Sequence, residues 1–500
     1  MIDPKFRFCP ASGSLLTGGP YTWHIVDIDQ RRHFAVTYDP PVPLQNDKDI
    51  DATEEICINQ LQRCIDKLGS GVYGIRFTEP DGPVTIITDP EEDMTQYANN
   101  HPLKALELPF TVKTVYLTNL TELDRLANQV DLVSYPGPPH LNGRVETIAV
   151  FKYWFIHNSM HSTWRELECW SRLPRDHPHI VPFDSVVLDS ITGGVVGFTN
   201  LYIPGGNLDD TATTRPFRLR WLHQLLSVVD DLNHRYGVMH QDIAPRNLVI
   251  DEREENLRIF DFGYSAMIDD DYSPHYDDWK GVVFTLYEII TRDVHLRRVP
   301  HEQQDADALL QRQRVKHPDV KLDSDVQTFR DVLDSWLVKR KATKFKPADT
   351  WIHWFDMPDA PPGWGVIHGP NGETTRIKKP RCSNLWRKNL VKWGKPFWNW
   401  ERPAGHLLAG ASKGVHQKAA GDKNSDEKAA AEKDVDQKAT GDKDPIEAAT
   451  DKIEVDNQVT AKTPPMKKYR ISKPKNRGTW VKRSRTRKSW KRSHGPGRRE

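Results

Sequence analysis

Two short motifs at a fixed separation constrain this 500-residue chain more than any other feature. The first reads HQDIAPRN and holds His240, Asp242 and Asn247 in the pattern HxDxxxxN. The second reads DFG and begins at Asp261, 19 residues after Asp242. Lys152 stands in the string AVFKY, at the end of a predicted strand and 90 residues before Asp242. Because the two motifs would coincide by chance with a probability on the order of 10⁻⁵, they indicate one shared site.

The residue types in these motifs suit the transfer of a phosphoryl group. Asp242 can orient an attacking hydroxyl and accept its proton. The carboxylate of Asp261 and the amide oxygen of Asn247 are hard oxygen ligands of the kind that Mg²⁺ prefers. Lys152 can pair with the inner phosphates, provided that a glutamate from a helix holds it in place.

The ordered set resembles the signature of the eukaryotic protein kinase superfamily. The HQDIAPRN sequence and the short segment after the DFG motif resemble a divergent fungal group of protein-kinase-like proteins. The resemblance spans about 105–340, where the sequence predicts strands first and helices later. We therefore expect an α+β fold with two lobes, a small β-rich N-lobe and a helical C-lobe, followed by a disordered C-terminal tail. The predicted strands are 132–135, 147–154, 181–187 and 194–203, and the predicted helices are 162–173, 216–236, 278–291 and 326–338.

The resemblance also implies which residues accompany the motifs. The glutamate that holds Lys152 should stand ten residues before Pro178 of the HPHIV segment, which selects Glu168 and makes Glu166 a solvent-facing residue. Arg246 resembles a phosphate-binding arginine of tyrosine kinases, since Ala244 occupies the position where many kinases carry a lysine. ATP and Mg²⁺ are the implied cofactors. The residues expected around ATP, besides the metal ligands Asn247 and Asp261, are Lys152, Val150, Val249 and the hinge residues Leu201, Tyr202 and Ile203, with Asn200 near the gatekeeper position.

Three departures from the family pattern affect the interpretation. The glycine-rich loop is replaced by YPGPPHLNG, which we read as a turn with fewer flexible N–H groups to cover phosphates. Gln241 stands where the family has an arginine that binds a phosphorylated activation loop. Only 17 positions separate Asp261 from Asp278, so the segment that docks a protein substrate is short or absent. Asp278 itself is expected to be a structural carboxylate held by backbone donors.

The leading hypothesis is an active Mg-ATP phosphotransferase, most simply a Ser/Thr-type protein kinase that acts on a protein substrate. Two alternatives remain open from the sequence. One is a pseudokinase scaffold, suggested by the altered phosphate loop and Ala244. The other is a small-molecule kinase of the aminoglycoside or choline type, which also uses HxDxxxxN and lacks a long activation segment.

Composition divides the rest of the chain. We expect an accessory region at 1–104, with one amphipathic helix around 58–68, and the kinase-like domain at 105–345. A Trp-rich extension follows at 346–405, whose aromatic residues we expect to anchor it to the domain rather than to stack on bases. Lys/Ala/Asp repeats at 406–462 have almost nothing to bury and should be disordered.

A basic tail at 463–500 ends the chain. From 467 to 500 there are 15 Lys and Arg and one acid, a net charge of +14, whereas residues 1–466 carry −13. The tail therefore predicts attachment to polyanions or binding to an import receptor. The five scattered cysteines, the lack of a secretory signal and the absence of an apolar run of about 18 residues predict an intracellular protein, cytoplasmic or nuclear, without a membrane span.

Overall fold

The computed structural model describes residues 2, 6–15, 19–98, 100–108, 110–140, 143–211, 214–268, 274–358, 362–368, 374–380 and 384–408. All of these residues belong to one compact unit of the chain. The basic tail and nearly all of the predicted repeats lie outside the described residues.

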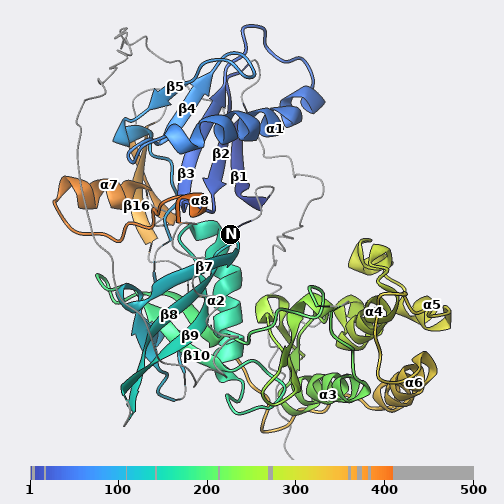
Figure 1. Ribbon diagram of the computed structural model, residues 1–500. Coiled ribbons are helices and arrows are strands. Elements are labelled where there is room, and N and C mark those ends of the chain that lie inside the picture. The colour runs from blue at the N-terminus through green and yellow to red at the C-terminus, as the bar shows by residue number, and fades with distance from the viewer. Residues whose placement is uncertain are drawn as a thin grey trace, which may run out of the picture. The chain divides into compact units, whose positions relative to one another are not determined.

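The N-terminal region is a small sheet covered by one long helix (Figure 1). Its strands lie in the order of the chain: β1 (Phe8–Leu15), β2 (Tyr21–Asp27), β3 (Arg32–Tyr38), β4 (Gly74–Phe77) and β5 (Thr85–Ile87). The helix α1 (Asp47–Cys64) connects β3 to its parallel neighbour β4. Cys57 and Leu61 of α1 are buried against Phe34 and Val36 of β3, so this region has a hydrophobic core of its own.

A six-stranded sheet follows, with the strand order β6-β10-β11-β9-β8-β7. Its strands are β6 (Thr114–Tyr116), β7 (Thr121–Ala127), β8 (Val130–His140), β9 (Gly143–Tyr153), β10 (Phe183–Leu188) and β11 (Val195–Leu201). The helix α2 (His157–Arg172) lies between β9 and β10 in the chain. The predicted strands and helix are present, but the predicted turn at PGPP is wrong. Strand β8 continues through this string, pairing Pro136 with Glu146 and His140 with Gly143, and its register shifts between Pro136 and Pro139 because proline has no N–H to donate.

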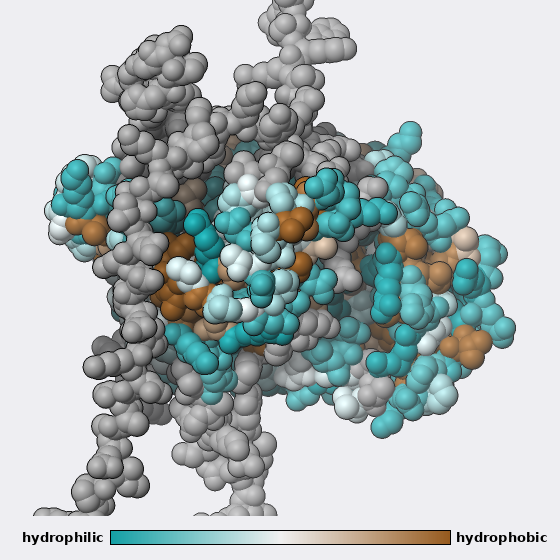
Figure 2. Space-filling model, turned by 90° about the horizontal axis from the view of Figure 1, so that it is seen from above, coloured by the Kyte–Doolittle hydropathy of each residue, from teal (hydrophilic) through white to brown (hydrophobic). Residues whose placement is uncertain are grey.

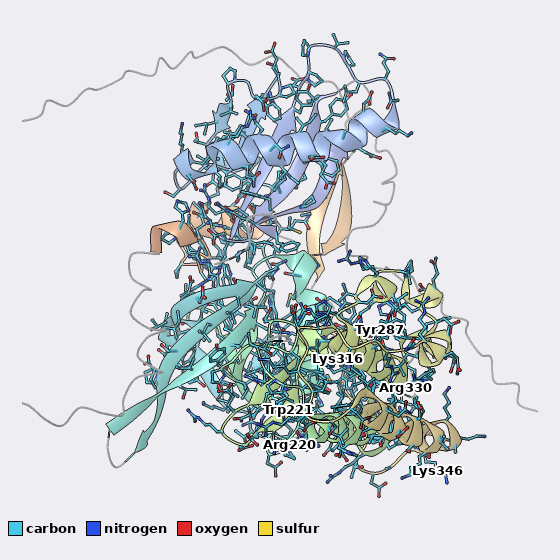
Figure 3. All side chains as sticks on the ribbon, turned by 45° about the vertical axis from the view of Figure 1, so that its right-hand side comes forward. Arg220, Trp221, Tyr287, Lys316, Arg330 and Lys346 are labelled. Carbon is cyan, nitrogen blue, oxygen red and sulfur yellow. The ribbon has the colours of Figure 1, made fainter. Side chains whose placement is uncertain are left out.

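The second half of the domain is helical, as expected. Its helices are α3 (Leu219–Asp230), continued by a π-helical turn (Asp231–Arg235), α4 (Asp278–Thr291), α5 (Ala306–Gln311) and α6 (Val326–Ala342). Two small sheets accompany them: β12 (Val238–Met239) with β15 (Ala266–Met267), and β13 (Leu248–Asp251) with β14 (Asn256–Ile259). Helix α3 is fastened to the second of these, since Arg220 Nη2 and Trp221 Nε1 donate to the Glu255 carbonyl at 2.6 and 3.0 Å (Figure 3).

The C-terminal extension contains β16 (Pro362–His368), β17 (Thr374–Pro380), α7 (Asn384–Lys392) and α8 (Gly405–Leu408). Trp351, Trp354 and Trp400 are buried, as the anchoring interpretation requires, while Trp393 is 54% exposed. Hydrophilic residues cover most of the described surface in Figure 2, and hydrophobic residues form small patches on it. Among the described residues, no helix is both long and apolar enough to cross a membrane.

Candidate active site

A buried carboxylate organises the loop that carries the first motif. Asp278, the first residue of α4, accepts hydrogen bonds from the backbone N–H groups of His240 (2.9 Å) and Gln241 (2.7 Å). It also accepts one from the side chain of Asn233 (2.7 Å). These bonds hold Gln241 in a left-handed conformation (φ 63°), which few non-glycine residues adopt. The prediction that Asp278 is a structural carboxylate is confirmed.

The side chain of Asp242 is held by its neighbours in the same loop. Asn247 Nδ2 donates to Asp242 Oδ2 and to the Asp242 carbonyl, both at 2.8 Å. Arg246 forms an ion pair with the other carboxylate oxygen, Oδ1, while its own side chain remains 51% exposed. The hydrogen bonds of Asn247 use its amide nitrogen, so its amide oxygen, the atom that binds metals, is not part of them.

The β13–β14 hairpin brings the two motifs together. Asn247 directly precedes β13 and Asp261 follows β14 by two residues, and Leu248 pairs with Ile259 at the open end of the hairpin. The Phe260 N–H donates to the Asn247 carbonyl at 3.1 Å, which fixes this end. Asp261 has φ 70°, a left-handed conformation that costs roughly 1 kcal/mol for a non-glycine residue and is retained where the surroundings enforce it.

Lys152 joins three elements of the site. Its Nζ donates to Glu166 Oε1 of α2 at 2.6 Å and to Asp261 Oδ1 at 2.7 Å. Burial lowers the pKa of the ammonium, but the two carboxylates outweigh it and raise the pKa overall. The pKa of Asp261 is lowered, since Lys152 outweighs the effect of burial. Burial raises the pKa of Glu166 to about 7, with a further rise from the charge of Asp261, because one ammonium cannot neutralise both carboxylates.

The expectation that Glu168 holds Lys152 is wrong, and so is the expectation that Glu166 faces solvent. Glu166 is 4% exposed, and Glu168 instead forms an ion pair with Arg172 one turn further along α2. Residues two positions apart in a helix, such as Glu166 and Glu168, point about 200° apart around the helix axis, so only one of them can face Lys152. The correct position stands twelve residues before Pro178, two residues further from it than the family spacing predicts.

The sequence contained one signal for the correct glutamate. Trp170 lies four residues after Glu166, on the same face of α2, and is buried. Its ring lies 5.1 Å from the ring of Phe262 in the DFG motif, and the Phe262 ring lies 4.9 Å from His240. His240 Nε2 in turn contacts the Phe260 carbonyl at 3.1 Å. Phe262 therefore packs between α2 and the loop of the first motif, and His240 shapes that loop.

The residues expected around ATP lie on two sides of the site. Val150 is on β9, two residues before Lys152 and on the same face of the strand. Leu201 ends β11, where it pairs with Ala149 of β9, and Tyr202 N–H donates to the Ile148 carbonyl at 3.3 Å. Val249 of β13 belongs to the large core cluster, and Ile203 packs against the same cluster. Asn200, the expected gatekeeper, is 2% exposed.

The charges near the two motifs do not cancel. Three carboxylates, those of Asp242, Glu166 and Asp261, face two cations, Lys152 and Arg246, which leaves a formal charge of −1. Within the described part of the chain, no group of three or more His, Cys, Asp or Glu residues is arranged to hold a metal by itself. A carboxylate and an amide oxygen with excess negative charge fit a divalent cation that takes its remaining ligands from phosphate and water.

Comparison with known proteins agrees with this geometry. Residues 147–287 match the family described as protein kinase domain. CBL-interacting protein kinase 22 of Oryza sativa subsp. japonica is 39% identical over 116 residues, which cover 21% of this chain and 24% of the rice protein. CBL-interacting serine/threonine-protein kinase 15 of Arabidopsis thaliana is 36% identical over 97 residues, covering 19% and 22%. The chain thus spans about a quarter of the length of these curated relatives. They are plant proteins, and the finer resemblance to a fungal group stays a prediction.

Proposed function

Because this chain belongs to the protein kinase superfamily, we propose that it transfers the γ-phosphoryl group of ATP to a protein hydroxyl, as a Ser/Thr-type kinase of reduced architecture. The observation that carries the proposal is the double contact of Lys152 with Glu166 and Asp261, at 2.6 and 2.7 Å. Protein kinases need both the pair between the strand lysine and the helix glutamate and a correctly placed DFG aspartate.

Each residue of the site has a distinct role in the proposed reaction. Bound Mg-ATP supplies the phosphoryl group and neutralises charge on the phosphates. Lys152 orients the inner phosphates, and Asp261 and Asn247 hold the metal. Asp242 accepts the proton of the attacking hydroxyl at its carboxylate, which Asn247 Nδ2 orients at 2.8 Å. Arg246 lies beside Asp242 and can balance negative charge that develops on the transferred group.

ATP binds, in this proposal, between β9 and the β13–β14 hairpin. Val150 and Val249 contact the adenine ring from either side, and residues 201–203 offer it backbone groups. Each site assignment, including Glu166 in place of Glu168, is part of the proposal. The placement of the adenine ring beside β9 is supported by Val150, which lies on the same face of this strand as Lys152.

Two other functions remain to be tested against this one. A pseudokinase scaffold is favoured by β8, which carries prolines where the family has a glycine-rich loop and so has fewer N–H groups for phosphate. A small-molecule kinase is favoured by the short segment between Asp261 and Asp278. The names of the relatives, three of which are serine/threonine-protein kinases of Arabidopsis thaliana, favour a protein substrate.

The decisive experiment is phosphate transfer from radiolabelled ATP by the full-length protein, compared with the variant Asp242→Asn. Parallel assays offer a panel of proteins, choline and aminoglycosides. We expect transfer to protein that depends on Asp242. Transfer to a small alcohol alone would favour the small-molecule kinase. If the protein binds ATP but shows no phosphate transfer above that of the Asp242→Asn variant, the result would favour the pseudokinase scaffold.

For the tail, we propose binding to polyanions or to an import receptor, which requires no contact with the kinase domain. Its fifteen cations attract such partners through charge alone. A truncation to 1–462, imaged in cells beside the full chain, tests this role. An unchanged distribution would argue against import.

A further inference from the structure

The strand that carries Lys152 is covered on the face that points away from the candidate site. Alternation along β9 turns Val150 and Lys152 to one face and Ala149, Phe151 and Tyr153 to the other. These last three residues are buried in a cluster that also contains residues from both ends of the described chain, namely Val26, Ile28 and Trp400. An antiparallel pair of strands commonly leaves one face to solvent. In β9 the covered face is the one opposite to Lys152, since Ala149, Phe151 and Tyr153 are buried while Ile148 on the Lys152 face is 45% exposed.

Tyr153, the neighbour of Lys152 in sequence, is held from two sides. Arg31 Nε donates to the Tyr153 hydroxyl at 2.8 Å, and the Arg31 guanidinium lies 4.3 Å from the centre of the ring. The ring of Trp400 stacks on Tyr153 with a centroid distance of 5.5 Å and an angle of 11° between the planes. Tyr153 is fully buried, so these contacts fix the position of the end of β9.

A network of charged residues ties the same three segments together. The network contains three arginines and three acids, so its formal charges balance. The N-terminal region contributes Asp29 and Arg31, strands β7 and β8 contribute Glu122, Arg125 and Asp131, and the C-terminal extension contributes Arg402. Asp29, Arg125 and Asp131 are buried, and the side chain of Arg402 is 7% exposed. A buried network whose charges are paired is rigid, because removing one partner leaves an uncompensated charge in a low dielectric.

The hydrogen bonds of the network connect the N-terminal region, the strands β7 and β8, and the C-terminal extension directly to one another. Arg402 Nη1 donates to Glu122 at 2.6 Å and to Asp131 at 2.9 Å, and its Nε donates to the Asp29 carbonyl at 2.7 Å. Arg125 Nη1 donates to Asp29 Oδ1 at 2.7 Å. Arg31 forms an ion pair with Asp131, which pairs with Phe151 of β9 in the sheet. The network therefore reaches β9 through its neighbour β8.

We propose that Tyr153 is a positioning residue for Lys152, and that the N-terminal region and residues 384–405 together form the support that holds it. This inference rests on the proposed function, since it concerns the lysine that orients the phosphates of ATP. The support acts on β9 from the face opposite to the nucleotide. Loosening it moves Lys152 relative to Asp261 without altering any group that touches adenine.

The test compares the dissociation constants of ATP and adenosine for the full-length protein, by calorimetry in the presence of Mg²⁺. The variants are Trp400→Ala, Trp400→Phe and Tyr153→Phe, and the matched control is Trp393→Ala, which alters a tryptophan of the same extension that is 54% exposed. We expect Trp400→Ala to raise the Kd of ATP about tenfold, and Trp400→Phe to restore most of the loss. Tyr153→Phe, which removes one hydrogen bond, should raise the Kd of ATP about threefold. The Kd of adenosine and both constants of the control should stay within about twofold of wild type.

The selective loss of ATP affinity separates positioning from general destabilisation, which would weaken both ligands together. If Tyr153→Phe and Trp400→Ala leave the ratio of the two constants unchanged while wild type binds ATP, the positioning role is wrong and the proposed function stands. If wild type binds neither ligand, the proposed function fails, and the inference fails with it. Should Trp400→Ala not fold, Tyr153→Phe decides, because it keeps the buried ring.

Discussion

The exchange Glu166→Gln should lower activity and raise stability at the same time. Glu166 is 4% exposed, and burial raises its pKa to about 7 from an ordinary value near 4.5. Each pKa unit corresponds to about 1.4 kcal/mol, so an ionised Glu166 costs the folded state about 3 kcal/mol at pH 8. A neutral glutamine avoids this cost. It also removes the charge 2.6 Å from the Lys152 ammonium, and phosphate transfer should fall roughly 100-fold.

The sign of the pH dependence follows from the direction of the shift. A carboxyl group whose pKa is raised by folding stabilises the protein fully at low pH, and this contribution is lost as the pH rises through the folded pKa. Glu166→Gln and wild type should therefore unfold with similar free energies near pH 5. The variant should be the more stable by about 3 kcal/mol at pH 8, as measured by urea unfolding at both pH values.

Glu168→Gln is the matched control. Glu168 is also buried, and burial raises its pKa to about 7, but its partner is Arg172. This variant should show a similar gain in stability at pH 8 and should keep phosphate transfer within about twofold of wild type. The reasoning is refuted if Glu168→Gln loses activity as severely as Glu166→Gln, or if Glu166→Gln transfers phosphate normally.

Further predictions concern other charged residues. Arg314→Met should raise the melting temperature, because Arg314 is 4% exposed and none of its three guanidinium nitrogens has a hydrogen-bond partner among the described residues; an unchanged or lower value would contradict this. Arg340→Met should instead cost roughly 3 kcal/mol in urea unfolding, since Arg340 binds the side chain of Asn233 in the interior. Asp278→Ala should destabilise the protein by roughly 3 kcal/mol, because it leaves buried N–H groups without an acceptor. Asp261→Asn should raise the Mg²⁺ concentration needed for half-maximal transfer at saturating ATP, and an unchanged Mg²⁺ titration would remove Asp261 from the metal site.

Local spacing in the sequence determined the core of the candidate site. Asp242 and Asn247 lie five residues apart in one loop, so a single turn brings them into contact. Helix α4 begins at Asp278 and ends at Thr291, as its apolar pattern predicts, because a continuous helix depends mainly on the residues within it. Asn247 and Asp261 flank the open end of the short β13–β14 hairpin, whose strands were not among those predicted from the sequence.

Tertiary structure decided what depends on rotation and on distant contacts. The choice between Glu166 and Glu168 depends on how α2 is turned against the sheet, and packing of Trp170 on Phe262 sets that rotation. The support behind β9 joins Arg31 to Trp400, which are 369 residues apart, and no local pattern relates them. Periodicity reports which face of an element is apolar, whereas the partner of that face is chosen by packing across the whole fold.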